Sequence, residues 1–135
     1  MSIVRHDSSN ILSLAVQYGE TVYLAGIVAK NLDADVKGQT KEILNEIDRL
    51  LAKCGTNKSK ILAATIWVTD IRNRAPMNEV WTAWCDPKNM PVRACVEAKL
   101  ADPRGLGLLH PHEPRRRGAR ARGDGAGEEG RPQGR

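Results

Sequence analysis

An abrupt change of composition at residue 104 limits the part of this chain that can form a folded core. From residue 104 to residue 135 the sequence uses nine residue types, with no Ile, Val, Met, Lys, Cys or aromatic residue. A segment with so few large apolar side chains buries too little surface to offset the entropy of ordering it. We therefore predict one folded domain over residues 1–103, a length that supports a single hydrophobic core.

The Arg-, Gly- and Pro-rich tail over residues 104–135 has two explanations. Every residue type in it has codons that begin with G or C, as expected when a GC-rich gene is read one base out of frame. We favour this frame-shift hypothesis, in which the tail replaces the last strand of the domain. The alternative is a genuine low-complexity extension that is disordered. Sequencing the gene around codons 100–106 separates the two.

The positive charge of the chain is concentrated in the same tail. Residues 1–102 contain 13 Lys and Arg against 12 Asp and Glu, a net charge of +1. Residues 103–135 contain 8 Arg against 4 acidic residues, a net charge of +4. The body therefore lacks the basic surface of a nucleic-acid-binding domain, and we do not expect it to bind nucleic acid.

Hydrophobic periodicity in the body changes repeatedly between strand and helix. Alternating or β-branched runs predict strands, and apolar residues at helical spacing predict two amphipathic helices. The predicted strands are 11–16, 21–28, 64–69 and 92–100, and the predicted helices are 36–53 and 75–86. The order β-β-α-β-α-β predicts an α+β fold, a sheet with two helices on one face, which lacks one strand to balance it.

Two strands carry features that bear on function. Gly26 lies inside the strand 21–28, where an interior glycine marks a bulge or a close approach by a ligand, and we favour the bulge. The strand 92–100 alternates, with Val92 and Val96 on one face and Arg93 and Cys95 on the other, as in a half-buried strand. The three tryptophans, Trp67, Trp81 and Trp84, are assigned to the core or to a subunit interface rather than to base stacking.

Arg93 is the first candidate for a functional role. Its guanidinium could bind a carboxylate bidentately, although a surface ion pair with Glu97 on the same face is the simpler interpretation. Cys95 lies two residues away, where a neighbouring cation would make its thiol more reactive, or it is only a small half-buried residue. Glu97 is either an acid–base group or a solvated charge.

Other classes of site are not indicated. Cys54, Cys85 and Cys95 form no C-x-x-C pair, and no metal-binding, phosphate-loop or serine-triad pattern is present, so we expect free thiols, no metal and no cofactor. The chain has no apolar run long enough to cross a membrane and no secretory signal, which makes the cytoplasm the expected location.

Several segments, in order, resemble the Rid family, also called the YjgF or RidA family. The segment Met90–Leu100 is similar to the family signature of Pro, any residue, Arg, Ala or Ser, any residue, and Val. Further similar segments are Tyr23–Gly26, Gln39–Leu44, Val68–Ile71 and Met77–Trp81. The resemblance covers about residues 3–104.

This resemblance implies a fold and an activity. The fold would be a chorismate-mutase-like sheet backed by two helices, assembled as a homotrimer with ligand clefts between subunits. The activity would be hydrolysis of reactive enamine and imine intermediates, 2-imino acids, to 2-oxo acids and ammonia, without a cofactor. The family's carboxylate-binding arginine falls on Arg93, its neighbouring cysteine on Cys95, and the pair whose backbone lines the cleft on Ala25 and Gly26.

The chain departs from the RidA-type pattern at two places. Leu12 stands where the family has a pocket tyrosine, and the tail stands where the last strand carries a glutamate thought to position water. Glu113 is in no matching motif and is not assigned that role. The alternative function is therefore a non-catalytic ligand-binding or regulatory trimer, or an RNA-directed protein, since relatives have been labelled endoribonuclease or translation inhibitor.

Overall fold

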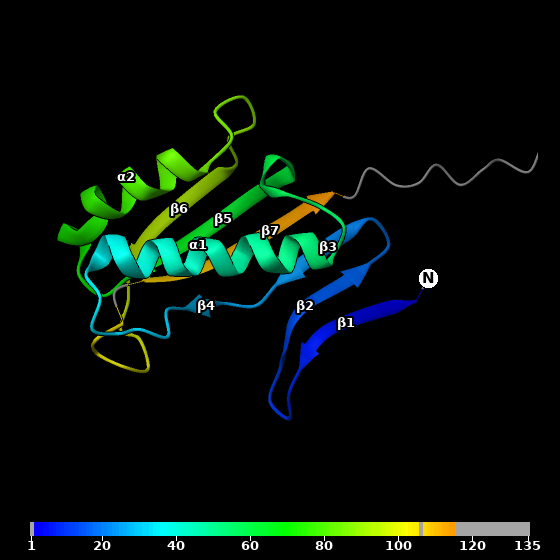
Figure 1. The fold of residues 1–135 in the computed structure, drawn as a ribbon, viewed down its shortest axis with the longest axis horizontal. Coiled ribbons are helices and arrows are strands. Elements are labelled where there is room, and N and C mark those ends of the chain that lie inside the picture. Colours follow the sequence, from blue (N-terminus) through cyan, green and yellow to red (C-terminus); the bar gives the residue numbers. More distant parts are fainter. Residues whose placement is uncertain (1, 106, 116–135) are drawn as a thin grey trace, which may run out of the picture.

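A computed structural model describes residues 2–105 and the backbone of residues 107–115 (Figure 1). The strands are β1 (Ile3–Ser8), β2 (Ser13–Tyr18), β3 (Thr21–Leu24), β4 (Ile27–Val28), β5 (Ile61–Val68), β6 (Val92–Glu97) and β7 (Gly107–Arg115). The helices are α1 (Val36–Lys53) and α2 (Arg74–Trp84), with short 3-10 turns η1 (Lys58–Lys60) and η2 (Ile71–Asn73). No helix in the described part of the chain is long and apolar enough to span a membrane.

The strands form one sheet in the order β1-β2-β3-β7-β5-β6, with β4 also pairing to β7. All neighbours are antiparallel except β5 and β6, which are parallel. Both helices lie on the same face of this sheet (Figure 1), and no helix of the described residues covers its other face. The predicted α+β fold, a sheet backed by two helices, is confirmed.

Helix α1 has the predicted bounds, because its sequence carries both end signals. Asp35 caps the first turn by accepting a 2.8 Å hydrogen bond from the Gly38 amide. Gly55 ends the helix with φ 72°, a left-handed conformation that glycine adopts without steric cost. The apolar face of the helix is buried against the sheet through Ile43, Leu44, Ile47, Leu50 and Leu51.

Two strands were not predicted from the sequence. Strand β1 is polar and mostly exposed, so it shows no clear alternation, and it forms because it pairs along β2. Strand β7 lies in the centre of the sheet, between β3 and β5, although it comes from the predicted tail. The sequence argued against a strand here because this segment belongs to a tail with few large apolar side chains. Its Pro111 and Pro114, opposite Ala64 and Ile61, also have no amide hydrogen to donate.

The remaining tail residues, 116–135, lie outside the described residues. The frame-shift hypothesis concerns the gene rather than the geometry of the chain. It stays a prediction, and sequencing of codons 100–106 remains its test.

The predicted strand 21–28 is interrupted at Ala25 and Gly26, where it becomes β3 and β4. Tyr23 is opposite His112 and Ile27 is opposite Leu109, so four steps along this strand match three steps along β7. One extra residue on one strand defines a β-bulge. The interpretation of Gly26 as part of a bulge is therefore confirmed.

The alternation of β6 is present, and the sheet register decides which face is covered. Arg93 and Cys95 are opposite Ala64 and Ile66 of β5, both of which are buried beneath the helices. Val92 and Val96 lie on the uncovered face, with 72% and 42% of their surface exposed. The polar row of this strand therefore faces the helices, and its valines face away from them.

Candidate functional site

Arg93 is held on the helix-covered face of β6 by two side chains of α2. Its Nη1 donates a 2.6 Å hydrogen bond to Asn78 Oδ1. Its guanidinium lies over the Trp81 ring, 5.6 Å from the ring centroid, a cation–π geometry. Asn78 and Trp81 are three residues apart on α2, so both project from the same side of the helix toward β6.

This arrangement is anchored in the core. Trp81 is 3% exposed and packs at 5.7 Å from Trp84, centroid to centroid. Trp84 Nε1 donates a 2.9 Å hydrogen bond to Asp48 Oδ2 on α1. The prediction that Trp81 belongs to the core is confirmed, and the contact with Asp48 links the surroundings of Arg93 to the longer helix.

Glu97 does not pair with Arg93, so the surface ion pair considered from the sequence is wrong. The Glu97 carboxylate instead accepts a 3.0 Å hydrogen bond from the Ile71 amide at the start of η2. None of the ion pairs among the described residues includes Arg93. No carboxylate of the described residues therefore neutralises the Arg93 guanidinium.

Cys95 lies on the same face as Arg93 and is partly buried against the hydrophobic core. A second thiol, that of Cys85 at the end of α2, is buried, and burial raises its pKa to about 11 although Lys58 and Arg93 oppose the shift. The Cys85 thiol is therefore protonated at neutral pH and is not a nucleophile.

Ala25 and Gly26 do not meet Arg93 within one chain. Strands β7 and β5 lie between the bulge and β6, since Ile27 pairs with Leu109, Leu109 with Ile66, and Ile66 with Cys95. Three strand spacings separate the two sets by roughly 14 Å. The site residues that the resemblance assigned to one cleft are thus in two places on the subunit.

Asn78 was missed as a candidate, although it lies in the Met77–Trp81 segment that carried part of the resemblance. Sequence spacing alone could not find it, because it comes next to Arg93 only when α2 packs on β6. Leu12, at the position of the family's tyrosine, lies in the β1–β2 connection with 48% of its surface exposed.

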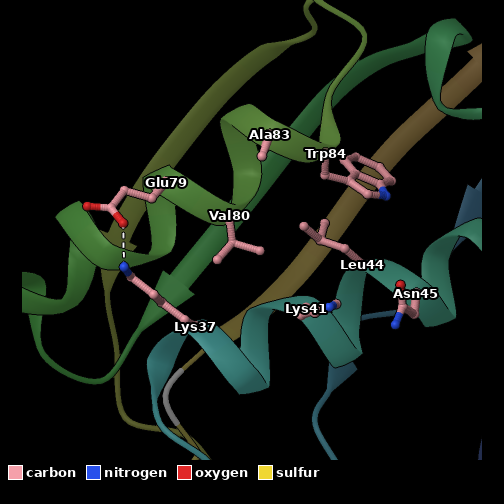
Figure 2. A pocket seen from close by; sticks show the side chains of 8 residues that line it. All are labelled: Lys37, Lys41, Leu44, Asn45, Glu79, Val80, Ala83 and Trp84. Carbon is pink, nitrogen blue, oxygen red and sulfur yellow. Dashed lines mark ion pairs between the residues drawn. The ribbon is translucent and has the colours of Figure 1, made fainter.

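A surface groove between the two helices does not include Arg93. A groove of about 460 Å³ runs between α1 and α2, and Leu44, Val80 and Trp84 form its apolar floor (Figure 2). An ion pair between Lys37 and Glu79 closes one end (Figure 2). Neither Arg93 nor Cys95 lines it. Within the described residues there is also no group of three or more His, Cys, Asp or Glu that could hold a metal ion.

Comparison with known proteins agrees with the fold. The family profile described as Endoribonuclease L-PSP matches residues 3–106, which include both helices and the whole of β6. The chain belongs to the Rid (YjgF) family.

Relatives of this Rid-family chain are similar over nearly their whole length. The RutC family protein YoaB of Escherichia coli is 44% identical over 104 residues, which cover 77% of this chain and 90% of that protein. A RutC family protein of Haemophilus ducreyi is 41% identical over 101 residues, covering 75% and 86%. The crystal structure of a YjgF-family protein from Neisseria meningitidis superimposes with a TM-score of 0.83 at 36% identity, covering 86% and 97%.

Proposed function

We propose that this Rid-family protein hydrolyses 2-imino acids to 2-oxo acids and ammonia, and that Arg93 binds the substrate carboxylate. The observation that carries the proposal is the state of Arg93. It is oriented by Asn78 and Trp81, and no carboxylate of the described residues pairs with it. A guanidinium with free N–H groups on one edge matches the two oxygens of a carboxylate.

Hydrolysis of an imine needs only modest catalysis by the protein. Water adds to the electrophilic C2 of the protonated imine, and one proton of the added water passes to nitrogen. The C–N bond then breaks as the remaining hydroxyl proton is lost to the departing ammonia, which leaves a 2-oxo acid and ammonium. Because the imine is already reactive, orientation by Arg93 and modest proton transfer supply most of what is needed. Burial and a raised pKa argue against a covalent intermediate on Cys85.

We further propose that the working unit is a homotrimer in which a cleft between subunits joins the two half-sites. Ala25 and Gly26 of one subunit would line the cleft beside Arg93 and Cys95 of another, because one chain holds the pairs apart. The uncovered sheet face supports this assembly: it exposes Tyr23, Val28, Val92 and Val96, all between 42% and 72% exposed. Free thiols at Cys85 and Cys95 support a cytoplasmic location, which we also propose.

The test is release of ammonia and 2-oxo acid from 2-iminopropanoate and 2-iminobutanoate generated in situ. We expect the wild-type protein to accelerate the release and Arg93→Ala to abolish the acceleration. The control is Arg74→Ala, which removes an exposed arginine from the first residue of α2 and should leave the rate unchanged. Equal rates for wild type and Arg93→Ala would contradict the proposal.

The second candidate is a ligand-binding or RNA-directed protein, favoured by the family description Endoribonuclease L-PSP and by the departure at Leu12. A folded trimer that binds 2-oxo acids without accelerating imine hydrolysis would support the binding role. RNA binding that disappears when residues 116–135 are deleted, a deletion that keeps β7 in the sheet, would assign that property to the end of the tail, with a steep dependence on salt.

A further inference from the structure

The hydrogen-bond acceptor that orients Arg93 is an amide and not a carboxylate. Three other arginines with side-chain bonds use carboxylates: Arg49 bonds to Asp7 and Glu46, Arg72 to Asp70, and Arg104 to Asp102. Arg93 alone among these four has a neutral acceptor, the Oδ1 of Asn78 at 2.6 Å. This difference has an electrostatic consequence.

An amide and a carboxylate orient a guanidinium equally well, but they leave it with different charge. Asparagine accepts one N–H and adds no net charge, so the remaining N–H groups stay fully cationic. An aspartate at the same place would form an internal ion pair and repel an incoming carboxylate. Trp81 also preserves the positive charge of Arg93, because its ring face attracts the cation without neutralising it.

The position of Asn78 is also fixed well enough for this role. It lies one helical turn before Trp81 on α2, and Trp81 is held in the core against Trp84. Asn78 itself is half-buried, so water screens its contact with Arg93 less than at the exposed arginine pairs.

We infer that Asn78 is the positioning and specificity-determining residue of the anion site, where it orients Arg93 while preserving the positive charge that selects carboxylate-bearing substrates. The inference rests on the proposed function for the identity of the substrate. The inferred role of Asn78 can be tested without imine hydrolysis, because the affinity for a 2-oxo acid depends on the same positive charge of Arg93.

The experiment measures the Kd of 2-oxobutanoate by calorimetry, and kcat and KM of imine hydrolysis, in four folded variants. Asn78→Asp should raise Kd and KM roughly tenfold or more with little change in kcat, because the new carboxylate competes for Arg93. Asn78→Ala, which loses orientation but keeps the charge, should have a smaller effect. Asn78→Ser, whose hydroxyl is a neutral acceptor on a shorter side chain, should lie between Asn78→Ala and wild type. Asn45→Asp places the same charge on an exposed position of α1 and should change neither constant.

Each outcome either supports or overturns the role inferred for Asn78. Equal constants for Asn78→Asp and Asn45→Asp would overturn the inference, as would Asn78→Ala binding no better than Asn78→Asp. If Asn78→Asp does not fold, Asn78→Ala and Asn78→Ser still test orientation, and equal affinity in both and in wild type would overturn the inference. A wild-type protein that binds 2-oxobutanoate, loses this affinity in Asn78→Asp and hydrolyses no imine would overturn the proposed function alone. A wild-type protein that binds no 2-oxo acid would overturn both.

Discussion

The two faces of the sheet have similar apolar character but different coverage. On one face, Ala64, Ile66 and Val68 of β5 are at most 4% exposed beneath α1 and α2. On the other face, Tyr23, Val28, Val92 and Val96 are 42–72% exposed. The first face is completed by the helices of the same chain, whereas the second has no cover within the described residues.

The helix-covered face stabilises the single subunit. The other face, which no helix of the described residues covers, can be buried by another molecule. Burial of the helix-covered face contributes to folding of a single chain and also fixes Arg93 against α2. A contiguous exposed apolar face is typical of an interaction site. Four substitutions probe how the covered and uncovered parts of the subunit contribute, from the largest to the smallest expected effect on the free energy of unfolding of one subunit.

The largest effect is expected from Leu50→Ala on the covered face. Leu50 is fully buried, so the substitution removes apolar contacts and leaves a cavity that costs about 2–5 kcal/mol. Urea denaturation monitored by tryptophan fluorescence measures the loss. The control is the same substitution at Leu62, which is 53% exposed and should cost less than about 1 kcal/mol. Equal losses at the two leucines would mean that the helices do not cover the face as described.

The next effect is expected from Gln39→Ala, at the edge of the covered face. The Gln39 amide nitrogen is buried and donates to the carbonyl oxygens of Leu32, Ala34 and Arg104 at 3.0–3.1 Å. These bonds join the segment before α1 to the segment that leads into β7. Leaving the carbonyls without a donor should cost about 1–3 kcal/mol in the same denaturation experiment. Lys41→Ala, two residues along the helix and exposed, should be close to neutral.

A smaller, pH-dependent effect is expected at Asp7, where β1 contacts α1. Hydrogen bonds from Lys53 and Arg49 lower the pKa of the Asp7 carboxyl from 3.8 to about 2. Because the folded-state pKa is lower than the unfolded one, this stabilisation is present above about pH 4 and is lost as pH falls toward 2. Thermal unfolding should therefore show a weaker decrease between pH 4 and pH 2 in Asp7→Asn than in wild type. Glu20→Gln, an exposed residue of the β2–β3 turn, should retain the wild-type profile.

The smallest effect on the subunit, and the largest on assembly, is expected from Val96→Asp on the uncovered face. The side chain is 42% exposed in the single chain, so unfolding of the subunit should change by less than about 1 kcal/mol. A carboxylate buried without a partner in a subunit interface is costly, so the oligomer should dissociate. Light scattering after size-exclusion chromatography measures the mass. Ile11→Asp, on an 84% exposed side chain of the β1–β2 connection, should leave the mass unchanged, and an intact Val96→Asp oligomer would place the interface elsewhere.

The fold was predictable where local signals were strong. Helix α1 has its capping Asp35, its terminal Gly55 and an apolar residue at every buried position except Gln39, and its bounds were predicted correctly. Strands β1 and β7 were not predictable, because β1 has no apolar alternation and β7 carries two prolines. Strand β1 forms by pairing with the next strand, β2, and β7 by pairing with β3 and β5, which are distant in sequence; neither pairing is encoded by a local pattern.

The candidate site likewise contains residues that the sequence identified and residues that only the packing of α2 on β6 revealed. Arg93 was identified from its place on an alternating strand and from the family resemblance. Asn78 and Trp81 were not assigned to it, since they lie 15 and 12 residues earlier in the chain and meet Arg93 only across a helix–sheet contact. The expected pair with Glu97 was wrong, because the packing of η2 gives that carboxylate a backbone amide to bond.

The α+β class, the limits of α1, the bulge at Gly26 and the family were all predictable from the amino-acid sequence, because each depends on short-range spacing or on ordered segments. Three features required the three-dimensional fold: the Arg93 side of β6 faces the helices, the acceptor of Arg93 is neutral, and two strands, β7 and β5, lie between β6 and the segment of Ala25 and Gly26. The physical reason is that a strand's alternation defines two faces without saying which one is covered. That choice depends on which face the helices pack against, an interaction between residues far apart in the chain.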